Sequence, residues 1–202
     1  MYLFKKKDYR NYPLEELVEL AQKNSTEALE ELIKRNQNSV YASFYYLSSE
    51  CQDILDLTQE ALLKMAKNIK SLKEPKKFKS WLNQIVTNVF YDYIRKTNRV
   101  PKTVPIDKSD DDGSEVCPKI IDLPCKSKNP EETTLGDELS DVIENSIHKL
   151  PDAFRLAIVL REFQGLSYEE IAEITKTNVG TVKSRIARAR SRLQEDLKSY
   201  IA

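Results

Sequence analysis

Apolar side chains recur at helical spacing along most of this 202-residue chain, and the pattern stops between residues 100 and 134. That stretch holds five of the eight prolines and three consecutive aspartates. Because prolines and dense charge disfavour a packed helix, a flexible acidic linker is expected over residues 101–134. The sequence therefore predicts two helical units, residues 13–100 and 135–202, after an N-terminal tail of residues 1–12.

The composition favours helices over strands. Glycine occurs four times and charged residues make up 32% of the chain, which is typical of helices rather than of a turn-rich β fold. Helices are predicted over residues 14–47, 52–69 and 78–98, with Pro13 and Ser25 as starting points within the first range. The predicted fold class is all-α: a small helical bundle and a second small helical domain, joined by the linker.

Several function classes conflict with this composition. The longest unbroken apolar run is Leu156–Leu160, far short of the roughly 18 residues of a membrane span, and the N-terminus lacks the apolar stretch of a signal peptide. Cys51, Cys117 and Cys125 form neither a disulfide framework nor a metal knuckle, and the last two are interpreted as free thiols. His148 is the only histidine, and four glycines exclude both G-x-G-x-x-G and a P-loop. We therefore expect a soluble cytoplasmic protein that is not an enzyme and has no cofactor or metal.

The net charge of zero conceals an alternation along the chain. Residues 61–102 carry eleven basic and two acidic side chains, whereas residues 103–150 carry five and twelve. Residues 151–202 are again basic, with nine and seven. Two basic regions separated by an acidic one indicate two contacts with a polyanion.

The last forty residues have the pattern of a helix-turn-helix. Ser167 and Glu170 form a capping box at the start of a short helix, and Lys176-Thr177 makes the turn. Asn178 is predicted to cap the following helix. This arrangement is typical of motifs that place a recognition helix in the major groove.

The second helix of this motif has an apolar face and a basic face. Its apolar face is Val182, Ile186, Ala189, Leu193 and Leu197. The opposite side carries the residues that we expect to contact DNA: Thr181, Lys183, Ser184, Arg185, Arg188 and Arg192. Between residues 181 and 192 there are five basic and no acidic side chains, and arginine suits both guanine edges and phosphates.

Three segments closely resemble region 4 of bacterial sigma factors of the extracytoplasmic-function (ECF) group. They are Leu150-Pro-Asp-Ala-Phe-Arg155, Gly165 to Ile174, and Val179 to Arg190. Asp53 to Lys64 resembles the polymerase-binding helix of region 2 in the same family, and Phe78 to Arg95 resembles its −10 helix. The resemblance implies a non-catalytic subunit that binds the large subunits of core RNA polymerase and promoter DNA. It also implies that the basic side of the second helix contacts the −35 element, and that an anti-sigma factor is a possible further partner. Lys176 stands where many relatives turn on glycine, so the resemblance implies a left-handed backbone at this residue.

The resemblance assigns two surfaces to the first unit. Asp53, Asp56 and Glu60 lie at helical spacing and form an acidic stripe, and with Leu57 and Gln59 they are the expected polymerase contacts. The expected −10 contacts are mostly basic and lie in or beside the connection before residue 78: Lys70, Lys73, Lys76, Lys77, Lys79, Asn83, Asn88 and Arg95. In ECF relatives this connection receives a flipped −10 base, so residues 70–79 are the candidate pocket.

Two alternatives and one ambiguity follow from the same residues. A stand-alone helix-turn-helix regulator with an N-terminal protein- or ligand-binding domain predicts operator binding without polymerase. A regulator of this kind does not explain the acidic stripe. The second alternative, a pure interaction adaptor, does not explain the basic recognition helix. Trp81 follows Ser80 where housekeeping sigma factors carry a tryptophan pair, so its place in the core or on DNA stays open.

Overall fold

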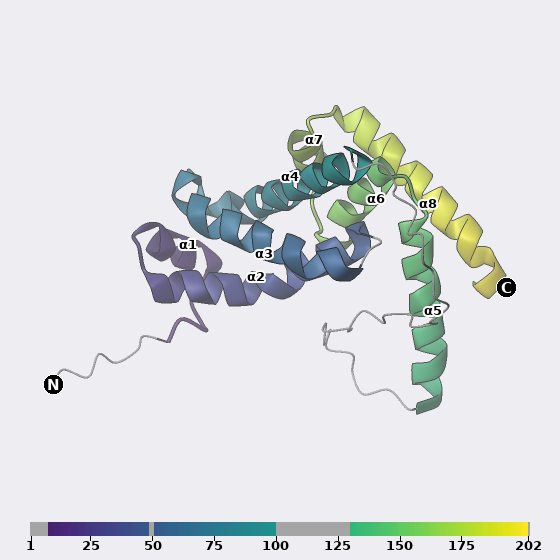
Figure 1. Ribbon diagram of the computed structural model, residues 1–202, viewed down its shortest axis with the longest axis horizontal. Coiled ribbons are helices and arrows are strands. Elements are labelled where there is room, and N and C mark those ends of the chain that lie inside the picture. The colour runs from purple at the N-terminus through teal and green to yellow at the C-terminus, as the bar shows by residue number, and fades with distance from the viewer. Residues whose placement is uncertain (1–7, 49–50, 100–129, 202) are drawn as a thin grey trace.

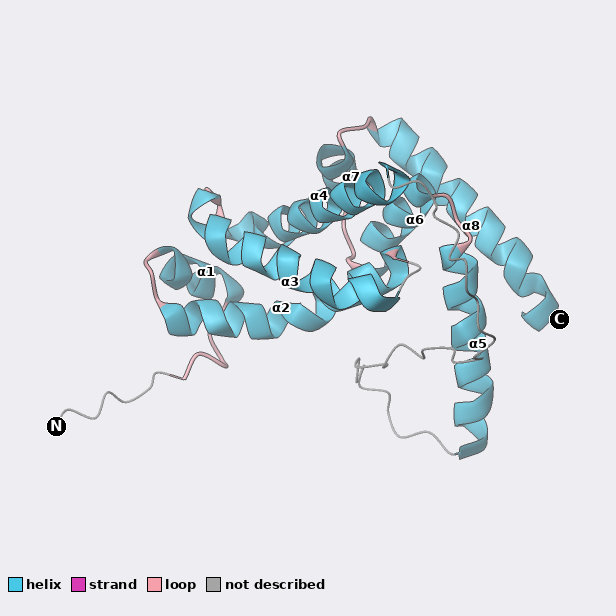
Figure 2. Ribbon diagram, in the orientation of Figure 1, coloured by secondary structure: helices cyan, strands magenta, loops and turns pink. Residues whose placement is uncertain are grey.

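The computed structural model describes residues 8–48, 51–99 and 130–201. Regular structure within these ranges is helical throughout, as the sequence predicted (Figure 2). The expected linker lies almost wholly outside the described residues, as do Cys117 and Cys125. Among the described residues, no helix is long and apolar enough to cross a membrane.

The first unit contains four helices, which confirms the predicted bundle: α1 (Leu14–Gln22), α2 (Thr26–Leu47), α3 (Cys51–Asn68) and α4 (Phe78–Arg99). Pro13 precedes α1, and the Ser25 hydroxyl accepts a hydrogen bond from the Ala28 amide at 3.2 Å at the start of α2. Their shared core includes Phe44, Met65 and Phe90. Two short 3₁₀ turns, η1 (Ile69–Ser71) and η2 (Pro75–Lys77), make the basic connection between α3 and α4.

The second unit comprises α5 (Pro130–His148), α6 (Asp152–Ile158), a π-helical turn η3 (Val159–Phe163), α7 (Tyr168–Thr175) and α8 (Val179–Ile201). Helix α5 begins five residues before the predicted boundary at residue 135, so the end of the expected linker is helical. Gly165 ends the π turn with φ of +66°, a conformation that favours glycine. Leu160, Ile171 and Ile186 lie in the core of this unit.

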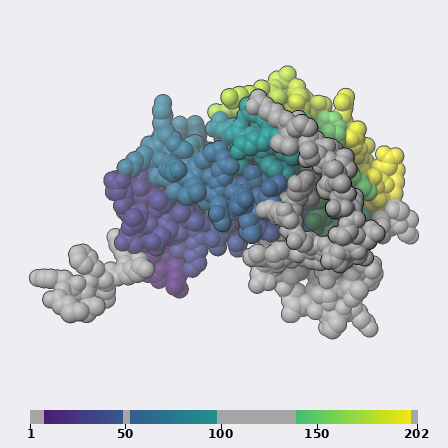
Figure 3. Space-filling model, in the orientation of Figure 1, coloured from purple at the N-terminus to yellow at the C-terminus, as the bar shows by residue number. Residues whose placement is uncertain are grey.

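The two units pack against each other. Helix α7 lies on α4, while α5 and α6 contact α2 (Figure 1). In the space-filling view the teal surface of α4 meets the yellow-green surface of the second unit (Figure 3). The buried side chains of both units form one continuous cluster. This contact joins segments that the sequence separates by the linker.

Candidate nucleic-acid interface

The first helix and turn of the helix-turn-helix have the predicted local geometry. The Ser167 hydroxyl accepts from the Glu170 amide at 3.1 Å, and the Glu170 carboxylate accepts from the Ser167 amide at 2.8 Å, which confirms the capping box. Lys176 has φ of 52° and ψ of 43°, which confirms the left-handed turn. The Thr177 amide then donates to the Ala172 carbonyl at 3.0 Å and closes the end of α7.

The start of α8 is capped as predicted. Asn178 Oδ1 accepts from the Thr181 amide at 2.7 Å and from the Thr181 hydroxyl at 2.9 Å. Val182, Ile186 and Ala189 are buried, so the apolar face of α8 packs on its own unit. The outward side therefore carries the polar residues of the recognition helix.

These polar residues differ in their surroundings. Lys183, Ser184, Arg188 and Arg192 are exposed, whereas Thr181 and Arg185 are half-buried. The Lys183 ammonium lies 5.8 Å from the centre of the Tyr168 ring, and the Arg192 guanidinium lies 5.4 Å from that of Phe154. Both cations are thus partly held by aromatic rings of their own unit.

The acidic stripe lies on α3 and faces away from the bundle. Asp56 and Gln59 are exposed and Asp53 is half-buried, while Glu60 forms an ion pair with Lys64 at 2.7 Å. Leu57 belongs to the core instead, with 6% of its surface exposed, because its helical phase turns it toward the bundle.

Two leucines that sequence reasoning missed lie beside the stripe. Leu55 is 50% exposed and Leu63 is 58% exposed, so α3 presents apolar as well as acidic side chains. Their signal in the sequence is that neither fits the apolar face formed by Ile54, Ala61 and Met65.

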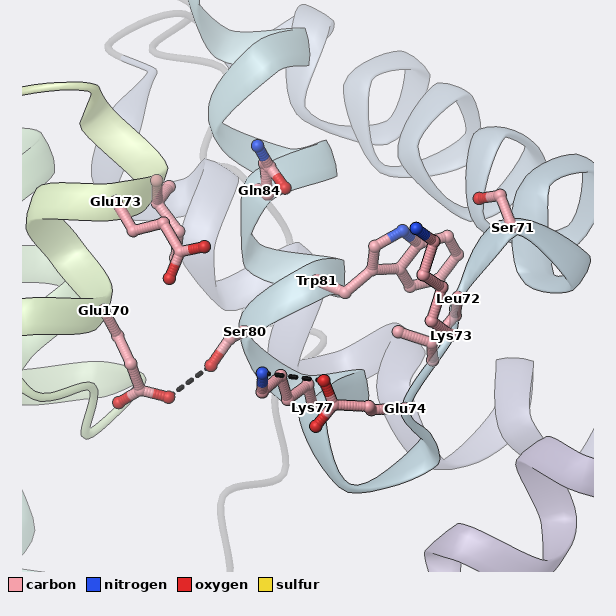
Figure 4. A pocket seen from close by; sticks show the side chains of 11 residues that line it. Ser71, Leu72, Lys73, Glu74, Lys77, Ser80, Trp81, Gln84, Glu170 and Glu173 are labelled. Carbon is pink, nitrogen blue, oxygen red and sulfur yellow. Dashed lines mark hydrogen bonds and ion pairs between the residues drawn. The ribbon is translucent and has the colours of Figure 1, made fainter.

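The connection before α4 borders a cleft of about 200 Å³ (Figure 4). Lys73 and Lys77 come from the connection, Trp81 from α4, and Glu170 and Glu173 from α7. The indole of Trp81 is half-buried in the cleft wall, with its ring centre 6.0 Å from that of Phe78.

The expected −10 contacts fall into two groups. Lys70, Lys73, Lys76, Lys77, Lys79, Asn88 and Arg95 are exposed. Lys77 pairs with Glu74 at 2.9 Å, which raises the pKa of the lysine, and Arg95 pairs with Asp92 at 2.5 Å. Asn83 is only 4% exposed and donates to the Lys79 carbonyl at 3.0 Å. It lines a small inner cavity with Asn36 and Val40 of α2 and with Gln164, so it does not lie on the outer face.

Comparisons with known proteins agree with this arrangement. Residues 32–100 match the model of Sigma-70 region 2, and residues 140–193 match that of Sigma-70 region 4. An ECF RNA polymerase sigma-E factor of Haemophilus influenzae is 35% identical over 90% of this chain and 94% of its own length. The sigma-E factor of Escherichia coli K12 is also 35% identical, over 92% of this chain and 94% of its own.

Solved structures show the same fold. The sigma factor RpoE of Bartonella quintana, in complex with the anti-sigma factor NepR, has a TM-score of 0.61 and 29% identity. The match covers 84% of this chain and 96% of that one. CnrH in complex with the cytosolic domain of CnrY has a TM-score of 0.60 at 19% identity, covers 92% and 97%, and shows the fold alone.

A region 2 bundle followed by a region 4 helix-turn-helix defines a sigma-70-type transcription initiation factor. Within that class the chain belongs to the ECF RNA polymerase sigma factors. It is therefore a DNA-binding sigma factor that directs RNA polymerase in transcription initiation. The alternative of a stand-alone helix-turn-helix regulator is not favoured, because the first unit matches region 2.

Proposed function

We propose that three surfaces of this chain divide the work of promoter recognition. The acidic stripe of Asp53, Asp56 and Glu60, with the neighbouring Gln59, binds core polymerase. The exposed lysines of residues 70–79, with Asn88 and Arg95 on α4, contact the −10 element as its strands separate. The outward side of α8 contacts the −35 element as duplex.

The observation that carries this assignment is that each surface presents exposed polar side chains on a well-packed helix or on the connection beside it. The carboxylate of Asp56 projects from α3 into solvent, and Ser184 and Arg188 project from α8, whose apolar face is buried. A rigid helix holds such groups in place, and this reduces the entropy lost when polymerase or DNA binds. The exposed Leu55 and Leu63 add an apolar component to the polymerase contact.

The functional units that we propose are residues 13–100 and 135–202, joined by residues 101–134. The chain carries out no chemical step itself and works in the cytoplasm, where the polymerase is. The sigma factor RpoE of Bartonella quintana was solved with the anti-sigma factor NepR, which supports an anti-sigma partner for this chain too.

Run-off transcription with purified core enzyme on a promoter library tests this function. We expect specific transcripts with the natural chain and none with a variant in which Asp53, Asp56 and Glu60 are replaced by lysine. The matched control replaces Glu15, Glu16 and Glu19, three exposed acidic residues of α1, by lysine.

The control has the same change in net charge, so it separates a local contact from general repulsion. Unchanged co-purification of the stripe variant with core polymerase, together with an unchanged helical spectrum, would contradict the assignment.

A further inference from the structure

The side chain of Gln22 ties the end of α1 to the connection between α3 and α4. Its Nε2 donates to the carbonyl of Ile69 at 3.0 Å and to the carbonyl of Leu72 at 2.6 Å. A glutamine amide has two N–H donors, so both of them are used on this one segment. Ile69 begins the 3₁₀ turn η1, and Leu72 is the residue that follows it. Gln22 therefore holds both ends of this turn.

The backbone at Gln22 is itself fixed by the way α1 ends. Gln22 is the last residue of the helix, and Asn24 has a left-handed backbone with φ of 68°. The Ser25 amide donates to the Leu20 carbonyl at 3.0 Å, and the Asn24 amide donates to the Ala21 carbonyl at 3.0 Å. These two bonds are the pattern of a Schellman motif, which closes the helix end in one geometry. The glutamine side chain thus extends from a rigid position.

Helix α1 packs on the bundle and on the connection together. Leu17 and Val18 are fully buried and Ala21 is 4% exposed, and the helix contacts α2, η1 and η2 (Figure 1). The match with the region 2 model begins at residue 32, so it assigns no role to α1. The contacts identify α1 as a support for the buried side of the connection.

The supported segment lines the cleft of about 200 Å³ beside α4, to which Leu72 and Lys73 both contribute. Leu72 has an extended backbone, and its side chain is 7% exposed. Successive side chains of an extended segment point to opposite sides, so a buried Leu72 directs Lys73 outward, where it is exposed. Because Gln22 holds the Leu72 carbonyl, it also fixes the direction of Lys73.

We propose that Gln22 is a positioning residue for −10 recognition, which holds residues 69–74 in the shape that accepts the promoter strand. The inference rests on the proposed function, in which the connection contacts the −10 element. Gln22 acts through the connection, because it is half-buried and both of its donors are bound to the two carbonyls. A segment held in one shape loses less conformational freedom on binding and discriminates better between bases.

Hydrogen exchange of the free, full-length protein tests whether Gln22 holds the connection. Gln22→Met keeps the length of the side chain and removes both donors. Because one hydrogen bond is worth a factor of about five, the amides of residues 69–77 should exchange about fivefold faster. In Gln22→Lys the ammonium can donate to both carbonyls, so this variant should restore the natural exchange rates.

Two control variants separate this local effect from general ones. Gln37→Met makes the same substitution at an exposed position of α2 and should leave the exchange rates unchanged. Val18→Ala shortens a fully buried side chain of α1, so it lowers the stability of the bundle without removing the bonds of Gln22. It should not reproduce a change confined to residues 69–77.

Run-off transcription by the holoenzyme on two promoter libraries measures the consequence for recognition. One library has a randomised −10 element and the other a randomised −35 element. Gln22→Met should relax the preference at a −10 position about fivefold and leave the −35 profile unchanged. Gln22→Lys should recover the −10 preference, and both control variants should keep the natural profile. A merely structural role for Gln22 would lower the transcript yield from all promoters alike.

Natural exchange rates over residues 69–77 of Gln22→Met would overturn the proposal. An unaltered −10 profile in that variant would overturn it too, as would an equal relaxation of the −10 profile by Val18→Ala. Failure of the natural chain to direct transcription would instead contradict the proposed function, and the exchange rates would still decide whether Gln22 holds the connection.

Discussion

Replacing Arg185 by alanine tests the reading face of the recognition helix most directly. At 1.5 Å per residue, Arg185 lies about 10 Å along the helix from the cap at Asn178, within the first two turns. The major groove is about 12 Å wide, so a side chain at this depth reaches base edges. Arg192 lies about 10 Å further along the helix, beyond the groove wall, and its guanidinium rests over Phe154.

Losing a bidentate contact to a base costs about 1–3 kcal/mol, or roughly 5- to 150-fold. Arg185→Ala should therefore relax the preference at one −35 position by that factor. Arg192→Ala should weaken all promoters alike and reduce the salt slope by about one unit, because a phosphate contact carries no sequence information.

Both variants are measured as holoenzyme on a promoter library with a randomised −35 element, at two salt concentrations. The holoenzyme is used because the proposed function has the chain bind promoters together with core polymerase. A preference profile that Arg185→Ala leaves unaltered would mean that another face of α8 reads the promoter.

Three further predictions concern strand opening and stability. Replacing Lys76 and Lys77 by glutamine should reduce the permanganate reactivity of unpaired thymines more than the occupancy of the closed complex, because these charges are proposed to contact the separated strand. Equal losses in both measurements would mean that these lysines are only general phosphate contacts. Ile186→Ala should destabilise the protein by about 2–5 kcal/mol in denaturant titration, because Ile186 is 1% exposed; a loss below 1 kcal/mol would contradict its core position. Burial, and then the charge of Arg155, lower the pKa of His148 below 6.5. Because the unfolded chain then binds more protons than the folded one, the free energy of unfolding should fall as the pH drops through 6.5. An equally steep fall in the His148→Gln variant would assign the effect to other groups.

Local physics explains which parts of this fold were predictable from sequence. The helices follow from apolar spacing, and their starts from short side chains that bond to amides three residues away, as at Ser25, Ser167 and Asn178. The left-handed backbone of Lys176 was predicted from the resemblance, because many relatives turn on glycine at this position. The exposed basic side of α8 follows from its buried apolar side. These features depend on residues within one or two helical turns.

The contact between the units was not predictable in the same way. Gln164 gives no local signal, because its partners Ser39 and Ser43 lie more than 120 residues away. Asn83 was expected on the DNA side, but it is buried in an inner cavity lined by residues of α2 and by Gln164, which the sequence of α4 alone does not reveal. Leu57 was assigned with its polar neighbours, although the phase of α3 turns it into the core.

The sequence by itself determined the helices, their caps and the three charged surfaces, because short-range periodicity and capping encode all of them. Only the tertiary structure decided how the two units pack against each other. That outcome depends on hydrogen bonds and packing between side chains far apart in the chain. Such contacts depend on the complementary shapes of two folded units, and the sequence of a single helix does not contain this information.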